Sequence, residues 1–297
     1  MICAAGGTLA SKTPGRREPS TARRIDKIAA PRAQRPGARA IRQAACLGRA
    51  HVPTGIRQTD SVFPIPFQFM AAHPLTLDHL VVAARTLDEG TRYVADTLGI
   101  EPAGGGAHAS MRTHNRLFGL WGGAYLEVIA PDPDAPPPAA GEQPRPRLFG
   151  LDDPATRARL EHGPYLAHWV VRVERPCELG RWQRQYPARI ARVVPMSRGD
   201  FHWQLTVPDD GALPAWQYAG DGVLPSLIQW QDTRHPSDTL PHGGVALRKL
   251  NGAHPHAHVL REQLAWLRAA HLIDIDAGDA PALVAEFETP AGMRTLR

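Results

Sequence analysis

Two stretches of the sequence share one pattern, LDHLVVA at residues 77–83 and LAHWVVR at residues 166–172. Each places a histidine among branched apolar residues, which is typical of a buried β-strand. Their histidines, His79 and His168, lie 89 residues apart. Two such strands at this distance indicate an internal repeat of one structural unit.

A second pair of stretches supports the repeat, because THNRL at residues 113–117 and FHWQL at residues 201–205 recur at a spacing of 88. After the first strand, Thr86 and Glu89 form a capping-box pattern that predicts a helix ending at Gly99. Strand patterns then follow up to the proline-rich segment that separates the repeats. Each unit is therefore predicted to have the order βαβββ.

These patterns predict an α+β fold built from two βαβββ modules. Module one covers residues 75–131 and module two covers residues 164–240, within a domain at residues 70–240. Residues 241–297 show strand and helix patterns that predict a C-terminal partial βαββ extension, which packs on this domain with a structural role.

The net charge of +5 is concentrated in one segment. Residues 1–69 hold 12 of the 34 Lys and Arg but 3 of the 29 Asp and Glu, so the rest of the chain is slightly acidic. This segment lacks apolar periodicity, and we expect a disordered basic leader. It fits a spurious N-terminal extension, because Met70 precedes the first patterned segment, or an Arg-rich targeting peptide. Neither alternative predicts specific nucleic-acid binding.

Several classes of protein find no support in the sequence. Cys3, Cys46 and Cys177 form no CxxC pair, which favours a protein of the reducing cytoplasm over a disulfide framework. No run reaches the roughly 18 apolar residues of a membrane span. The sequence has no GxGxxG after a strand, P-loop, GxSxG or HExxH motif, so it predicts neither nucleotide binding nor the common hydrolase chemistries.

Polar side chains recur at matching places among the apolar residues of the predicted strands. His79 and Glu127 have apolar neighbours on the same strand face, as has His168 in module two, where Gln229 corresponds to Glu127. Burying a carboxylate is costly unless it meets a cation, a donor or a metal ion, and His is a common metal ligand. The alternatives are a hydrogen-bonded core histidine at His168 and a polar lining residue at Gln229.

Four motifs, LDHLVV from residue 77, THNRLF from 113, YLEVIAP from 125 and LPSLIQW from 224, resemble the glyoxalase-like branch of the vicinal-oxygen-chelate superfamily. This resemblance implies that the modules pair into a cupped mixed sheet. It also implies a divalent metal ion (Zn, Ni, Mn or Fe(II)), bound by the first and last strands of each module. Carried over by position, the ligands are His79, Glu127, His168 and Gln229. Donors to one ion should lie within about 4 to 5 Å of one another.

The resemblance implies a metal-dependent lyase, isomerase or dioxygenase-like enzyme whose substrate chelates the metal through adjacent oxygens. Glu127 would be its catalytic base. Gln229 departs from the carboxylate that many metal-using relatives carry there, which argues against ring-cleaving dioxygenase activity. A metal-free protein that binds or sequesters a small molecule is the alternative.

His114, Asn115 and Arg116 lie in the middle of a predicted strand. We expect them to bind substrate, with His114 or Asn115 facing the cup and Arg116 supplying charge. A cross-strand pair on the solvent face is the alternative. The predicted partner is thus a small molecule, without specific nucleic acid or membrane, and a homodimer is the predicted assembly.

Overall fold

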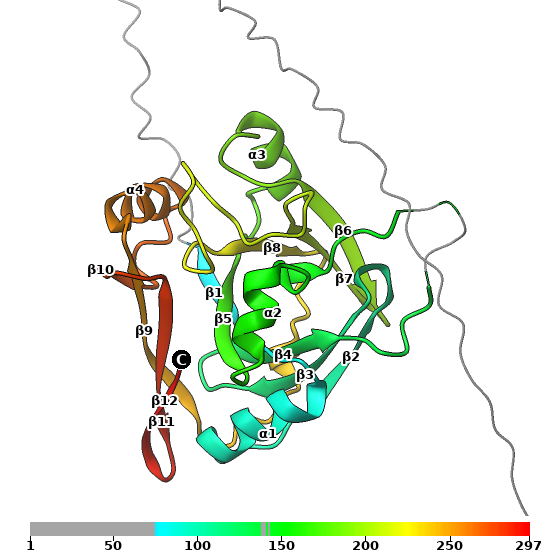
Figure 1. The fold of residues 1–297 in the computed structure, drawn as a ribbon, viewed down its shortest axis with the longest axis vertical. Coiled ribbons are helices and arrows are strands. Elements are labelled where there is room, and N and C mark those ends of the chain that lie inside the picture. The colour runs from blue at the N-terminus through cyan, green and yellow to red at the C-terminus, as the bar shows by residue number, and fades with distance from the viewer. Residues whose placement is uncertain (1–74, 138–140, 142) are drawn as a thin grey trace, which may run out of the picture. The chain divides into compact units, whose positions relative to one another are not determined.

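The computed structural model describes residues 75–137, 141 and 143–297, so the predicted leader lies outside the described residues. The largest element is an eight-stranded mixed sheet with the strand order β2-β3-β4-β1-β5-β8-β7-β6 (Figure 1). This order is symmetric about β1 and β5, which pair in antiparallel fashion at its centre. The predicted α+β fold with two paired modules in one sheet is confirmed.

Each module contributes one helix and four strands in the predicted order. Module one contains β1 (Thr76–Ala83), α1 (Leu87–Leu98), β2 (Gly104–His108), β3 (Thr113–Gly119) and β4 (Tyr125–Pro131). Module two contains β5 (Tyr165–Arg172), α3 (Leu179–Gln185), β6 (Val193–Arg198), β7 (Phe201–Thr206) and β8 (Ser226–Trp230). The connecting segments contain α2 (Pro154–Leu160) and the short 3-10 helices η2 (Ala109–Met111), η3 (Leu148–Gly150) and η4 (Pro236–Asp238).

The ends of α1 follow from the local sequence. Thr86 Oγ1 accepts a hydrogen bond from the Glu89 N–H at 3.2 Å, as the capping pattern predicted. Gly99 ends the helix in the left-handed region with φ 71°, where a residue without a side chain is least strained. The helix is thereby fixed between β1 and the next strand of its module.

The large sheet buries apolar side chains on both faces. One face packs against α1, α3 and the C-terminal region, and Leu80 and Trp169 are fully buried there. The concave face carries Val81 and Val170, and it is partly covered by residues 148–160 of the segment that connects the modules. Figure 1 shows α2 of this segment lying over the sheet. The uncovered part of the concave face is where a cavity forms.

The C-terminal region forms a second, four-stranded sheet with the order β10-β9-β11-β12. Its elements are β9 (Ala246–His254), α4 (Ala257–Leu267), β10 (Asp274–Ala277), β11 (Ala282–Thr289) and β12 (Gly292–Leu296). It therefore has one strand more than the predicted partial unit. The strand order of this sheet also differs from that of the modules. Its first strand, β9, pairs in parallel with the next strand, β10, whereas β1 of module one pairs in parallel with the last strand, β4. No helix in the described part of the chain is long and apolar enough to cross a membrane.

Candidate functional site

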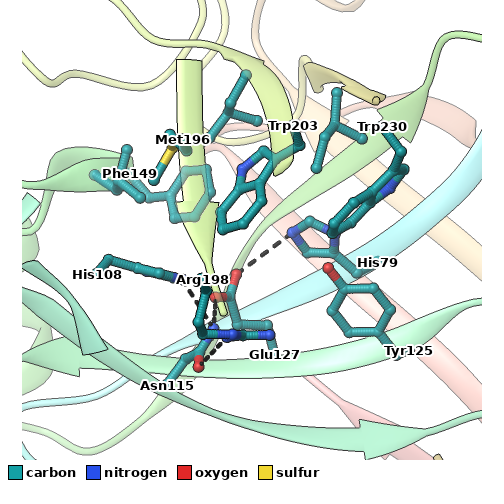
Figure 2. A pocket seen from close by; sticks show the side chains of 13 residues that line it. His79, His108, Asn115, Tyr125, Glu127, Phe149, Met196, Arg198, Trp203 and Trp230 are labelled. Atoms are coloured by element: carbon teal, nitrogen blue, oxygen red, sulfur yellow. Dashed lines mark hydrogen bonds and ion pairs between the residues drawn. The ribbon is translucent and has the colours of Figure 1, made fainter. Parts of the chain in front are cut away.

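A small cavity opens on the concave face of the large sheet, with an interior of about 30 Å³ within about 380 Å³ of space that includes open solvent. Polar side chains, mostly from module one, surround its floor: His79, His108, Asn115, Tyr125, Glu127 and Arg198. Apolar and aromatic side chains form the walls, among them Phe149, Met196, Trp203 and Trp230 (Figure 2). A few polar groups within an apolar wall are typical of a small-molecule site.

His79 and Glu127 meet at the floor of this cavity from the neighbouring parallel strands β1 and β4. His79 Nε2 lies 3.4 Å from Glu127 Oε2, and the two residues are only 4% and 5% exposed. The Tyr125 ring stacks on the His79 ring with centroids 4.6 Å apart. Figure 2 shows the Glu127 carboxylate directed into the cavity between the two histidines, His79 and His108.

A β-bulge places the Asp78 carboxylate beside the His79 ring. Leu77 pairs with Val171 and His79 pairs with Val170, so Asp78 is an extra residue in the ladder. Such a bulge re-aims side chains that would otherwise alternate between the faces. His79 Nδ1–H consequently donates to Asp78 Oδ1 at 2.7 Å.

Two donors from module two hold the other oxygen of Asp78. Trp230 Nε1–H donates to Asp78 Oδ2 at 2.9 Å, and His235 Nε2–H donates to the same oxygen at 3.0 Å. His235 Nδ1 accepts the N–H of Ser237, which leaves its Nε2 as the protonated nitrogen. The fully buried Asp78 therefore connects the two modules directly behind His79.

The three groups form a buried chain of alternating charge. Burial alone would lower the pKa of His79, but hydrogen bonds to Asp78 and Glu127 outweigh burial and raise the pKa to about 9. Burial alone would raise the pKa of Glu127, but the hydrogen bond and charge of His79 lower it to about 2. For Asp78 the hydrogen bonds from His235 and His79 likewise overcome burial and lower the pKa. At neutral pH an imidazolium thus lies between two carboxylates.

Asn115 links Glu127 to a cation at the other side of the cavity. Its Nδ2–H donates to Glu127 Oε1 at 2.5 Å, and its Oδ1 accepts from Arg198 Nη1–H at 2.9 Å and from the Gly106 N–H at 3.0 Å. His108 lies beside this amide, with its pKa lowered by burial, and is therefore neutral. The partners of Asn115 thus distinguish its amide oxygen, which accepts two hydrogen bonds, from its amide nitrogen, which donates to Glu127.

His168 occupies the place of His79 in module two but is part of a different arrangement. Val81 pairs with Glu127 in module one and Val170 pairs with Ser226 in module two, so Ser226 is the counterpart of Glu127. His168 Nε2 accepts the Ser226 N–H at 3.1 Å, and its Nδ1–H donates to Gly222 O at 3.1 Å. Burial lowers its pKa to about 3. His168 is a neutral core histidine with both ring nitrogens in use.

Gln229 lies on the face of β8 opposite to the cavity. Its Oε1 accepts the Leu179 N–H at 2.9 Å and its Nε2–H donates to Cys177 O at 2.7 Å, so the amide fixes β8 to the start of α3. The neighbours Ile228 and Trp230 face the cavity instead. The predicted correspondence between Gln229 and Glu127 is wrong, because the strand register assigns that place to Ser226.

The side chains present do not fit the predicted divalent metal ion. Of the four predicted ligands, the structure brings together His79 and Glu127 alone. The lone pair of His168 Nε2 is taken by a backbone N–H, and Gln229 lies on the far face. Within the described ranges no three His, Cys, Asp or Glu side chains converge into a group able to hold an ion. Two donors fall short of the three protein ligands that catalytic zinc sites use.

Among the three predicted substrate-binding residues, Asn115 lines the cavity. Arg116 is exposed on the other face of β3, and His114 lies with its Nδ1 3.8 Å from Asp132 Oδ1. Sequence reasoning missed several lining or supporting groups: Asp78, His108, Arg198, Trp203, Trp230 and His235. One of these residues could have been found from the local sequence, because Asp78 places a carboxylate directly before the site histidine His79.

Three comparisons relate the chain to known proteins. A family model described as glyoxalase-like domain matches residues 77–268. A hypothetical protein from Staphylococcus aureus is similar with 14% identity and a TM-score of 0.46, over 70% of this chain and 87% of that chain. Methylmalonyl-CoA epimerase from Mycobacterium tuberculosis is similar with 16% identity and a TM-score of 0.32, over 54% and 87%. The comparison with curated proteins gives no match. The family assignment therefore rests on the family model.

Proposed function

Because the chain belongs to the glyoxalase-like domain family, we propose that it is a small-molecule enzyme in which Glu127 moves a proton to and from carbon. Glu127 takes a proton from a C–H bond next to a carbonyl group, and the electron pair of that bond forms an enolate. The developing charge on the enolate oxygen is stabilised by the His79 imidazolium.

The observation that carries this proposal is the Asp78–His79–Glu127 chain at the cavity floor. Asp78 holds His79 Nδ1–H at 2.7 Å, so the other ring nitrogen, Nε2–H, is directed toward the cavity side and Glu127. This arrangement, in which one ring nitrogen binds a buried carboxylate and the other faces the cavity, resembles other sites in which a buried carboxylate orients a histidine. Asp78 does not itself line the cavity and acts through His79, so we assign it a positioning role.

The spacing of His79 and Glu127 supports exchange of partners when a substrate enters. Their 3.4 Å separation is longer than the roughly 2.7 to 2.9 Å of a tight charge-assisted hydrogen bond. A carbonyl oxygen that accepts the His79 Nε2–H would replace this contact. Glu127 would then lose its strongest partner, and its pKa would rise toward the range of an effective base.

The metal-dependent and dioxygenase-like versions of this function, which the resemblance implied, lack a suitable donor set at the site. His79 and Glu127 point at each other, and no third donor of the predicted set reaches them among the described residues. The proposal therefore assigns every step to protein side chains.

Deuterium incorporation tests the proposed reaction without knowledge of the natural substrate. The protein in D₂O is incubated with 2-oxopropanoate, 2-oxobutanoate, butanone and 2-oxopropanamide, and NMR follows loss of the C–H signals next to the carbonyl. We expect incorporation above the protein-free rate for at least one of these compounds. Rates equal to the protein-free rate for the whole panel would contradict the proposal.

A binding protein without catalysis is the second candidate, and the aromatic walls favour it. Trp203 and Trp230 lie with ring centroids 5.4 Å apart and both line the cavity, as does Phe149. Such surfaces hold planar ligands by stacking. Saturable binding of a panel compound without deuterium incorporation would favour this candidate. Residence in the reducing cytoplasm and assembly as a homodimer stay predictions.

A further inference from the structure

Arg198 places a cation at the cavity where module two meets module one. It is the last residue of β6, and its guanidinium reaches over Asn115 of β3 and beside Glu127 (Figure 2). A Cβ atom at position 106 would lie only 3.2 Å from Arg198 Cδ, so Gly106 leaves the room that the side chain needs. The guanidinium is thus held at a defined place rather than extended into solvent.

The charge of Arg198 is not neutralised by a carboxylate. Among the described residues its hydrogen-bond partner is the neutral Asn115, and none of their carboxylates lies within 4.0 Å of it. Arg147, by comparison, contacts Asp152 at 2.6 Å. The nearby carboxylate of Glu127 is already engaged by His79 and Asn115. A half-buried guanidinium at a cavity has N–H groups left for a ligand, and its planar fork matches a carboxylate.

We propose that the cavity selects small organic acids, whose carboxylate binds Arg198 while the reacting carbon lies beside Glu127. This inference rests on the proposed function, since it names the substrate class for that reaction. A ligand of this class supplies the carboxylate that Arg198 lacks among the described residues, where its hydrogen-bond partner is the neutral Asn115. An uncharged ligand would leave the guanidinium unpaired in a partly apolar cavity.

The position of Asn115 limits the length of the acid. One amide group separates the two contacts, since Arg198 binds its oxygen at 2.9 Å and Glu127 accepts from its nitrogen at 2.5 Å. A carboxylate on Arg198 therefore brings a carbon one or two bonds away to Glu127. With a carbonyl oxygen on His79, this arrangement fits short 2-oxo acids, in which the reacting carbon lies two bonds from the carboxylate carbon. Phe149, Met196 and Trp203 provide apolar contacts for the remaining carbons.

Calorimetric titration with matched acids and amides tests the inference on the full chain. The probes are 2-oxopropanoate and 2-hydroxypropanoate, each compared with its uncharged amide. We expect the acids to bind at least tenfold more tightly than the amides. Arg198→Gln should weaken acid binding at least tenfold and should not weaken amide binding, because only the acids use the guanidinium.

Arg116→Gln is the matched control, since Arg116 follows Asn115 on β3 but is exposed on the other face. It should bind the acids as the unmodified protein does. Arg198→Lys keeps the charge without the planar fork of the guanidinium and should give intermediate affinity for the acids. This variant still tests the inference if Arg198→Gln unfolds at a lower temperature.

Equal affinity for acids and amides would overturn the inference, as would unchanged acid binding in both Arg198 variants or no acid binding at tens of millimolar. The two proposals fail separately. Acid binding that depends on Arg198 without deuterium incorporation contradicts the proposed function alone. Incorporation into butanone and 2-oxopropanamide as fast as into 2-oxopropanoate contradicts the substrate class alone.

Discussion

Replacing Glu127 with Gln is expected to lower the rate of deuterium incorporation by about 100-fold or more, because the amide cannot accept the proton. The substitution preserves the shape of the side chain and an oxygen for the hydrogen bond from Asn115 Nδ2–H. Because it also removes a carboxylate from the buried chain with His79, the free energy of unfolding should fall as well, so the rate is measured at a temperature at which the variant is folded. NMR measurement of the incorporation rate, together with a thermal unfolding curve, distinguishes loss of the base from loss of the fold.

Glu101→Gln is the matched control for this experiment, because Glu101 is exposed and lies outside the cavity. Its incorporation rate should equal that of the unmodified protein. Incorporation by folded Glu127→Gln within a few-fold of the unmodified rate would remove Glu127 from the mechanism.

Replacing Asp78 with Asn is expected to lower the free energy of unfolding by about 3 to 5 kcal/mol, the usual cost of removing one partner from a buried ionic network. Asp78 is fully buried and accepts from His79, Trp230 and His235. An Asn side chain offers a single acceptor oxygen and turns an N–H group toward a donor. Chemical denaturation measured at one pH for both proteins gives the difference.

Asp96→Asn serves as the control for Asp78, because Asp96 is exposed on α1 and should change the unfolding free energy by less than about 0.5 kcal/mol. An Asp78→Asn protein as stable as this control would mean that the buried network contributes nothing to the fold. It would also remove the reason for a raised pKa at His79.

Local patterns predicted the modules because each carries its own strand and helix periodicity. β1 and β5 are both eight residues long and begin 89 residues apart, as the two histidine-containing stretches indicated. Alternation along β3 predicted that one of His114 and Asn115 would face the concave side, and Asn115 does. These predictions depend only on the period of two residues within a strand.

Positions that depend on register could not be predicted in the same way. Gln229 was aligned with Glu127 from the ends of their strands, but the length of the loop before β8 moves Ser226 into that place. The β-bulge at Asp78 likewise breaks the alternation on which face assignments rest. A single inserted residue in β1 was enough to hide the carboxylate that orients His79.

Contacts between the modules could not be predicted from the sequence either. Asp78 accepts from His235, 157 positions further along the chain, and Asn115 accepts from Arg198, 83 positions further along the chain. Arg198 ends the edge strand β6, and His235 caps η4, so neither local setting indicates the distant partner. Tertiary packing alone brings these side chains to the site.

A charged His79 between two carboxylates is the central claim, and it has a consequence for stability. The folded pKa of about 9 exceeds the value of 6.5 for an unperturbed His, so His79 stabilises the fold fully below pH 6.5. This contribution is lost as the pH rises through 9. The contribution of His79 to stability is present only while its imidazole is protonated and can bind both carboxylates.

NMR titration of the His79 imidazole measures this claim most directly. Comparison with the spectrum of a His79→Gln protein assigns the ring signals, and their shifts are followed from pH 5 to pH 10. The hydrogen bonds to Asp78 and Glu127 predict a titration midpoint near 9, well above the ordinary value of 6.5. A midpoint at or below 6.5 would show a neutral, merely buried histidine and would contradict the account.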